Sequence, residues 1–367
     1  MTPPGKPLRS NGYLHGLDTL RMVASVLVVY THVANWFATR GHIWWGSAWI
    51  DRDVIGPLHL NPALSFAGVA TFLVVSGLVV THVANRETPG QFLRRRLTRI
   101  GPLLLATTVS AWCLINLGVL GAVSKQKSLD VGDLLLGTTM TGYFTTPEVV
   151  LNGVTWTLLV QVVFYLFVAA TIPLLRSRAW LPPALAAAVV CVGLSFATAV
   201  HHNIPVHRVG IIAAFLPVLC IGQLISLVRN RHVSAPVGIA VGAANFMLFV
   251  WAGKLGEYFH TGTSHPRTLL LVIGVVILAM TAGGRISRSA VVRGWSARTY
   301  AIYLLHPLCI YPLMDWMVPD LGPDVSLVTA LAVLAAVNEV FHRYLEMPVN
   351  QWIRAREKTR TRPSGRV

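Results

Sequence analysis

The sequence predicts an all-α, polytopic transmembrane bundle of about ten helices with both termini in the cytoplasm (N-in, C-in). Hydrophobic residues make up 54% of the 367 residues and charged residues only 12%, about half the charged share of a soluble domain. Apolar runs recur along the chain near the length of ~20 residues that crosses a bilayer. We divide the chain into a cytoplasmic tail (1–16), a membrane domain (17–348) and a basic cytoplasmic tail (349–367).

Ten predicted spans follow from hydropathy and length. They lie near residues 17–36, 61–84, 100–122, 154–175, 180–200, 209–228, 233–253, 267–283, 297–314 and 325–345. The stretch 129–147 is too polar and too short for an eleventh. No cleavable signal peptide is expected, because no small-residue cleavage site follows the first apolar helix.

The positive charges predict the orientation of these spans. With the N-terminus inside, 22 of the 30 Lys and Arg residues lie in cytoplasmic segments and seven in outer segments, and Arg21 lies within the first span. This asymmetry is typical of N-in, C-in proteins, and the basic C-terminal tail is expected to contact anionic membrane lipid. No soluble basic face remains for nucleic acid, so no nucleic-acid partner is expected.

An arginine and a histidine share one face of the first span. Arg21 and His32 are eleven residues apart in LDTLRMVASVLVVYTHVANW, which is about three helical turns and ~16 Å along the axis. Ionisable groups inside a membrane span are costly and usually serve function. The pair therefore predicts a functional path along this helix.

An arginine cluster precedes the third predicted span, in QFLRRRLTRIGPLLL. Arg96 and Arg99 are neighbours on a helix, with Arg94 and Arg95 beside them, and we expect Pro102 to mark the start of the span. Arginine suits multidentate phosphate recognition, so a polyanionic cytosolic ligand is one interpretation. Ordinary positive-inside charge is the other.

Polar groups also interrupt the fourth and ninth spans. In WTLLVQVVFYLF, Gln161 and Tyr165 are four residues apart and share a face, with Trp156 before them. In TYAIYLLHPL, His306 precedes Pro307, which frees the carbonyl four residues back and favours a kink. Such groups either line a site or join helices by hydrogen bonds.

The histidines and tryptophans of the predicted outer loops have two interpretations each, and the cysteines have one. Seven of the 13 histidines fall in outer loops, where they line an extracytoplasmic pocket or are simply solvated: His42, His59, His201, His202, His207, His260 and His265. Trp44, Trp45 and Trp49 suit an interfacial aromatic belt or a stacking platform. All four cysteines fall in apolar spans without ligand spacing, so we interpret them as packing residues and expect no metal.

These residues together resemble the integral-membrane acyltransferase-3 family from Gly16 to about Trp352. The shared motifs are LDTLRMVASVLVVYTH, with its Arg, ten residues, His pattern; FLVVSGLVVTH; FLRRRLTRIGP; WTLLVQVVFYL; TYAIYLLHPL; and YLEMPVNQWI. Their order and spacing make the resemblance specific. Gln161 departs from the family, which usually carries an acidic residue there.

The resemblance implies an acyl-CoA-dependent O-acyltransferase of the plasma (inner) membrane. The donor would be acetyl-CoA or another acyl-CoA on the cytoplasmic side, without a metal, and the acceptor a hydroxyl of a saccharide, cell-envelope glycan, glycolipid or glycosylated natural product. The implied donor-binding residues are Arg95, Arg96, Arg99 and Ser76. The implied acceptor-site residues are Trp156, Gln161, Tyr165 and His306.

His32 and Arg21 are the expected catalytic residues. His32 would act as general base, because an unperturbed imidazole titrates near neutrality, and Arg21 would anchor the donor or stabilise negative charge. A route through acyl-His32 stays open. A secondary transporter with an intramembrane Arg/His site is the alternative function, although no internal repeat relates residues 17–175 to 180–345. A receptor or scaffold would leave the arginine cluster and the Arg/His alignment unexplained.

Overall fold

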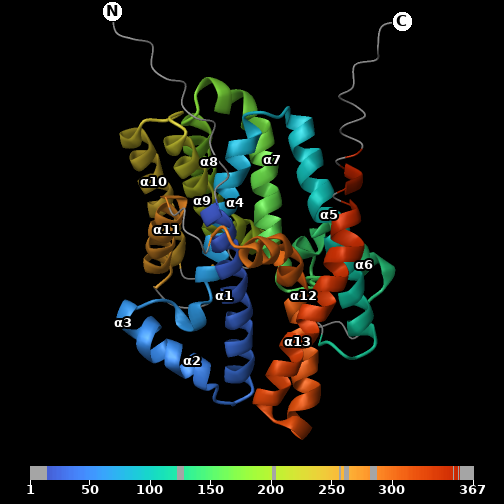
Figure 1. Ribbon diagram of the computed structural model, residues 1–367. Helices are drawn as coiled ribbons and strands as arrows, with labels where there is room; N and C mark the ends of the chain where they lie inside the picture. Colours follow the sequence, from blue (N-terminus) through green and yellow to red (C-terminus); the bar gives the residue numbers. More distant parts are fainter. Residues whose placement is uncertain are drawn as a thin grey trace, which may run out of the picture.

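A computed structural model describes residues 15–121, 128–200, 204–255, 258–259, 264–281, 287–349, 351–353 and 355. Within these ranges the chain forms helices and no strands, arranged as a bundle (Figure 1). The sequence-based predictions for most of both tails, and for the loop residues Lys125, Lys127, His201, His202, His260 and Arg285, lie outside the described residues.

Nine helices of the described part are long and apolar enough to cross a membrane. They are α1 (His15–Thr39), α4 (Ala67–Ala84), α5 (Pro89–Asn116), α7 (Thr155–Ser177), α8 (Leu181–Ala199), α9 (Ile204–Arg229), α10 (Ala235–Lys254), α12 (Ala290–Leu321) and α13 (Pro323–Phe341). The predicted span 267–283 corresponds to α11 (His265–Thr281), which has 17 residues and is ~26 Å long. The prediction of a polytopic helical bundle is confirmed.

Short helices lie at one end of the bundle. The first outer loop forms α2 (Trp45–Ile50), a π-helical turn (Asp51–Ile55) and α3 (Gly56–Leu58), at the same end as the junction of α12 and α13 (Figure 1). The stretch expected to be too short for a span forms the nine-residue α6 (Val131–Thr139) and a 3-10 turn (Thr141–Phe144). Within α2, Trp45 and Trp49 are exposed, as an interfacial belt requires.

Helix α5 begins about ten residues earlier than predicted. Thr88 caps it by accepting a hydrogen bond from the Gln91 backbone N–H, the Gln91 side chain accepts one from the Thr88 N–H, and Pro89 occupies the first turn. This reciprocal cap is strong enough to start a helix, and arginine is a good helix former. The expectation that Pro102 marks the helix start was wrong, because Pro102 lies inside α5. The arginine cluster is therefore part of helix α5.

Helix α12 is also longer than the predicted span 297–314. It has 32 residues and contains Pro307, Pro312 and Pro319. Its first N–H groups are capped by the Ser289 hydroxyl, which accepts from the Val292 N–H at 3.2 Å. Helix α12 packs extensively against α1, and this packing brings His306 into contact with His32.

Glycines place α4 at the centre of the bundle, against α1 and α9. A Cβ at Gly77 would lie 2.0 Å from the Leu219 carbonyl oxygen, and one at Gly222 would lie 2.1 Å from the Val74 carbonyl oxygen. Helices approach this closely only where side chains are absent. A Cβ at Gly68 would likewise lie 2.9 Å from the Ala24 carbonyl oxygen of α1. The backbone of α4 is therefore held from two sides.

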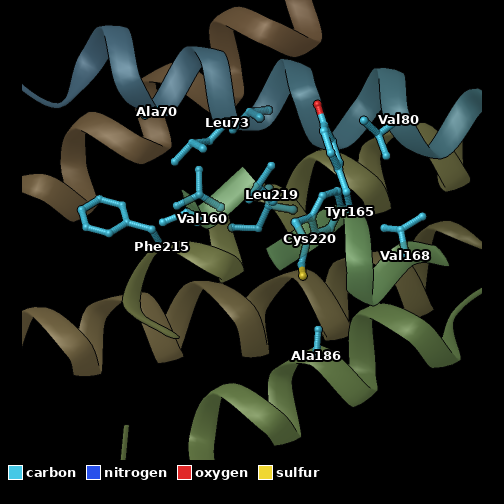
Figure 2. Packing of buried hydrophobic residues seen from close by; sticks show 14 of the residues in the cluster. Ala70, Leu73, Val80, Val160, Tyr165, Val168, Ala186, Phe215, Leu219 and Cys220 are labelled. Carbon is cyan, nitrogen blue, oxygen red and sulfur yellow. The ribbon is translucent and has the colours of Figure 1, made fainter. Parts of the chain in front are cut away.

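Apolar side chains fill the interface between α4, α7 and α9. Figure 2 shows Ala70 and Leu73 of α4 on the side of Leu219 of α9 and Val160 of α7, whereas the Cys220 sulfur points away from α4, towards Ala186 of α8. Cys220 and Cys309 are buried, whereas the other two cysteines are exposed on the helix surfaces, and all four thiols are free.

Candidate active site: two cavities along helix α4

An inner cavity of about 150 Å³ is bounded by α1, α4, α5, α7 and α12. It collects six of the residues predicted to be functional: Arg21, Ser76, Arg96, Arg99, Gln161 and Tyr165. No aspartate or glutamate is among the described residues that line it. Because three guanidinium groups contribute to its wall, the cavity is suited to an anion.

The Arg96 guanidinium has hydrogen-bonding capacity to spare in this cavity. It lies over the Phe92 ring at 5.5 Å, and its Nε is buried without a hydrogen-bond partner in the described structure. Arg21 has a nearby carboxylate, since its Nη1 lies 3.9 Å from Asp18 Oδ1. That carboxylate also accepts a hydrogen bond from Ser296 Oγ at 2.7 Å.

Ser76, Gln161 and Tyr165 form a polar cluster in the middle of the cavity wall. Gln161 Nε2 donates to Ser76 Oγ at 2.5 Å. Figure 2 shows the Tyr165 hydroxyl reaching α4 between Leu73 and Val80. The amide at position 161 thus acts as a donor joining α7 to α4, a contact that an ionised carboxylate could make only as acceptor.

A second, outer cavity of about 600 Å³ shares one lining residue, Val69, with the inner cavity and includes Ser47 of α2 in its lining. Its lining combines aromatic rings with polar groups, among them His32, Asn35, Asp51, Trp156, Arg208, Phe215 and His265. The Trp156 and Phe215 rings contact each other with centroids 4.8 Å apart. Of the outer-loop histidines, His265 does line a pocket, and its ring stacks on Phe259 at 4.7 Å.

His32 is held at the inner wall of the outer cavity by contacts with α12. Its Nδ1 lies 2.6 Å from the Tyr311 hydroxyl oxygen, and its ring meets the His306 ring edge-on with centroids 4.6 Å apart. A hydrogen bond to one imidazole nitrogen fixes which nitrogen faces the cavity. Tyr311 therefore orients His32.

His306 is completely buried and lines neither cavity. Its Nδ1 lies 3.1 Å from the Ile302 carbonyl oxygen, which can only accept, so Nδ1 carries the proton. The other nitrogen, Nε2, has no partner among the described groups. Pro307 frees the Tyr303 carbonyl on the same turn, and the Tyr303 ring lies 6.0 Å from the His306 ring.

Arg95 does not join the other predicted donor-binding residues. Its side chain forms an ion pair with the buried Glu87 carboxylate, and the Glu87 carbonyl oxygen accepts a hydrogen bond from Arg176 at 2.7 Å. Neighbouring helical residues point about 100° apart, so Arg95 faces the α4–α5 connection while Arg96 and Arg99 face the cavity. Trp156 is likewise separated from Gln161, because it lines the outer cavity.

Several residues that line the two cavities or contact His32 were not predicted from the sequence. For Tyr311 and Asn35, the sequence offers one signal of a role in the site. Asn35 lies within two helical turns of His32, and Tyr311 within two turns of His306. Phe72 and Tyr303 contact each other edge-on at 5.7 Å in the inner cavity. Arg208 faces the outer cavity and pairs with Glu148 through both carboxylate oxygens, at 2.6 and 2.5 Å.

The two cavities meet at one residue of α4. Val69 lines both of them. From Val69 the inner cavity follows α4 to Val80, and the outer cavity follows the chain back to Pro62. The structure therefore contains an arginine-lined chamber and a histidine-lined chamber placed end to end within a helical bundle.

The helical bundle thus has an arginine-lined cavity beside one that contains His32. Residues 14–337 match the model of the acyltransferase-3 domain. The chain belongs to this family of membrane acyltransferases.

Two relatives cover most of the chain. Nodulation protein 10 of Rhizobium leguminosarum bv. viciae is 25% identical over 332 residues, which span 83% of this chain and 85% of the relative. The exopolysaccharide production protein ExoZ of Rhizobium meliloti is 27% identical over 313 residues, which span 80% of this chain and 92% of the relative. No solved structure matches the chain.

Proposed function

We propose that this protein transfers an acyl group, acetyl in the simplest case, from cytosolic acyl-CoA to a hydroxyl of a cell-envelope saccharide or glycolipid at the plasma membrane. The observation that carries this proposal is the end-to-end arrangement of the two cavities, with arginines in one and His32 in the other. The positive-inside bias supports an orientation in which the arginine cavity lies towards the cytoplasm, where acyl-CoA is made.

The inner cavity is the proposed site for the donor. Acyl-CoA carries phosphates, and the unpartnered Nε of Arg96 and the exposed guanidinium of Arg99 supply charge-assisted donors for them. Arg21 is ~16 Å from His32 along α1, too far to stabilise charge that develops beside that histidine. We therefore assign Arg21 to donor anchoring.

His32 is the proposed general base. With Nδ1–H donating to the Tyr311 hydroxyl, the lone pair of Nε2 is free to take the proton of the acceptor hydroxyl. The acceptor oxygen forms a bond to the thioester carbonyl carbon, the C–S bond breaks, and the CoA thiolate leaves and is protonated. A covalent acyl-His32 route would use the same nitrogen as the nucleophile.

The outer cavity is the proposed acceptor site. Trp156 and Phe215 offer aromatic faces for the apolar side of a sugar ring, and Asn35 and Asp51 offer hydrogen-bonding groups for its hydroxyls. Its volume of about 600 Å³ accommodates a sugar unit. The printed name of one relative, an exopolysaccharide production protein, supports a saccharide acceptor. His306, buried behind His32, is proposed to support the acceptor site through that ring contact.

The test is acyl-CoA consumption by the purified full chain in lipid nanodiscs. We expect slow release of CoA from acetyl-CoA with water as acceptor. His32→Ala should lower the rate by about 10²–10⁴-fold while CoA binding, measured by calorimetry, stays near wild type. His82→Ala is the matched control, because this histidine of α4 lines neither cavity, and it should retain the wild-type rate.

Two outcomes would contradict the proposal. A His32→Ala rate above about a tenth of wild type, well short of a general-base effect, would exclude His32 as the base. A wild-type protein that never releases CoA from acetyl-CoA would favour the transporter alternative for this fold.

A further inference from the structure

We propose that Val69 is the residue that selects the length of the acyl group. This inference rests on the proposed function, because it requires a donor in the inner cavity and a reaction at His32. Val69 is the lining residue that the two cavities share. If the arginines of the inner cavity hold phosphates of acyl-CoA, the arm that carries the thioester would pass this side chain to reach His32.

The position of Val69 on α4 supports this role. The residues of α4 that face the inner cavity recur at helical spacing, through Val69, Phe72, Ser76 and Val79. Val69 is the last of them towards the outer side, and the next lining residue of this segment, Phe66, belongs to the outer cavity alone. The junction therefore has a single α4 side chain in its wall.

The backbone that carries Val69 is held in place. Gly68 packs against α1, where an added Cβ would lie 2.9 Å from the Ala24 carbonyl oxygen, and Gly77 packs against α9. Valine is also stiff, because its branched Cβ leaves one strongly preferred rotamer in a helix. The width at the junction therefore depends on the size of this side chain more than on movement of α4.

Side chains of the two cavity walls are also held in place by hydrogen bonds and ring contacts. On the inner side, the Tyr303 hydroxyl donates to the Val154 carbonyl oxygen at 2.8 Å and is also hydrogen-bonded to Thr157. On the outer side, the Trp156 ring packs against Phe215. An acyl chain too long for the passage would have to displace these groups, and one methylene in such a place changes rates by roughly 10–200-fold.

The experiment compares Val69→Ala and Val69→Phe with the matched variants Val83→Ala and Val83→Phe. Val83 is a partly buried valine of the same helix that lines neither cavity. Each full-length protein is assayed in nanodiscs for CoA release from acetyl-, butyryl- and hexanoyl-CoA, with water as acceptor. Water attacks the thioester carbonyl, the C–S bond breaks, and the products are the carboxylic acid and CoA. Binding of CoA itself is measured by calorimetry.

We expect Val69→Ala to raise the rate with butyryl-CoA relative to acetyl-CoA by about ten-fold. Val69→Phe should slow release from all three donors by a similar factor, and CoA binding should stay within about two-fold of wild type in every variant. If Val69→Phe does not fold, Val69→Leu replaces it and should discriminate further against butyryl-CoA.

The outcomes separate this inference from the proposed function. If the wild type neither binds CoA nor consumes acyl-CoA, the proposed function is wrong and the role of Val69 with it. If the wild type does both, and the Val69 variants keep its preference among donors, the Val69 assignment alone is overturned.

Discussion

Arg95 and Arg96 are adjacent in the chain but differ in what their guanidinium groups contact. The Arg95 side chain pairs with Glu87, whereas Arg96 lines the inner cavity with a buried, unpartnered Nε. An arginine-rich segment alone is an ordinary topology signal. The direction of each side chain from α5 distinguishes the donor-site candidates from the charges that only orient the helix.

We predict that replacing Arg96 and Arg99 together by Gln weakens acyl-CoA binding by at least about ten-fold, because charge-assisted hydrogen bonds contribute ~1.5–3 kcal/mol each. The KM for acyl-CoA should rise much more than that for the acceptor. Calorimetric titration with CoA measures the effect. Arg94 is an exposed arginine of the same helix that does not line the cavity. The control variant Arg94→Gln should therefore bind CoA with an affinity within two-fold of wild type. Equal CoA affinity in the double variant and the wild type would reduce the cluster to a topology determinant.

At the scale of elements, α4 organises the site because some sides of this helix pack against neighbouring helices while another side lines the cavities. Gly68 and Gly77 lie on opposite sides of the helix and allow contact with α1 and α9, and the face between them carries side chains of both cavity walls. The Ser-Gly pair of FLVVSGLVVTH shows this division directly. Gly77 contacts α9, while Ser76 faces Gln161 across the cavity.

We predict that Gly77→Ala destabilises the bundle, because its Cβ would meet the Leu219 backbone carbonyl at 2.0 Å and α4 and α9 would have to separate. Forced overpacking of this kind costs about 1–3 kcal/mol. The midpoint of thermal unfolding in detergent should fall, and CoA release should fall with it.

Gly101→Ala is the control for that prediction. This glycine lies inside α5, and an added Cβ would meet nothing within 4 Å, so the helix should gain up to about 1 kcal/mol. Its unfolding midpoint should equal or exceed that of the wild type. Wild-type stability and activity in Gly77→Ala would contradict the close packing of α4 on α9.

At the scale of the whole molecule, orientation relative to the bilayer determines which cavity meets the cytosol. In the predicted N-in, C-in orientation, ten antiparallel passes would put both ends of the helical region on one side, together with 22 of the 30 basic residues. We propose that the arginine cavity faces the cytoplasmic side and the His32 cavity the outer side.

We predict that a cysteine at Asp320, at the α12–α13 junction, reacts with a membrane-impermeant maleimide in intact cells. A cysteine at Arg288, before α12, should react only after the cells are permeabilised. The wild type measures the background from its four native thiols, which all lie in helices of the bundle. Labelling of Arg288→Cys in intact cells would overturn the orientation.

Much of the fold could be predicted because it depends on local properties. Span length and hydropathy identify helices one segment at a time, and the charge bias orients them. Helix ends were less accurate: α5 starts at Pro89 because Thr88 and Gln91 form a cap, a signal that outweighs Pro102 thirteen residues later. The site was predicted as a set of residues, and six of them do line one cavity.

The sequence by itself determined the membrane class, the family motifs, the helices and the shared face of Arg21 and His32. Only the tertiary structure decided that these two side chains open into different cavities, that Tyr311 holds His32, and that Val69 joins the chambers. Helical periodicity sets the direction of a side chain relative to its own axis. Which residue lies opposite that side chain depends on how closely separate helices pack. For α4 and α9, the reciprocal contacts of Gly77 and Gly222 set this distance.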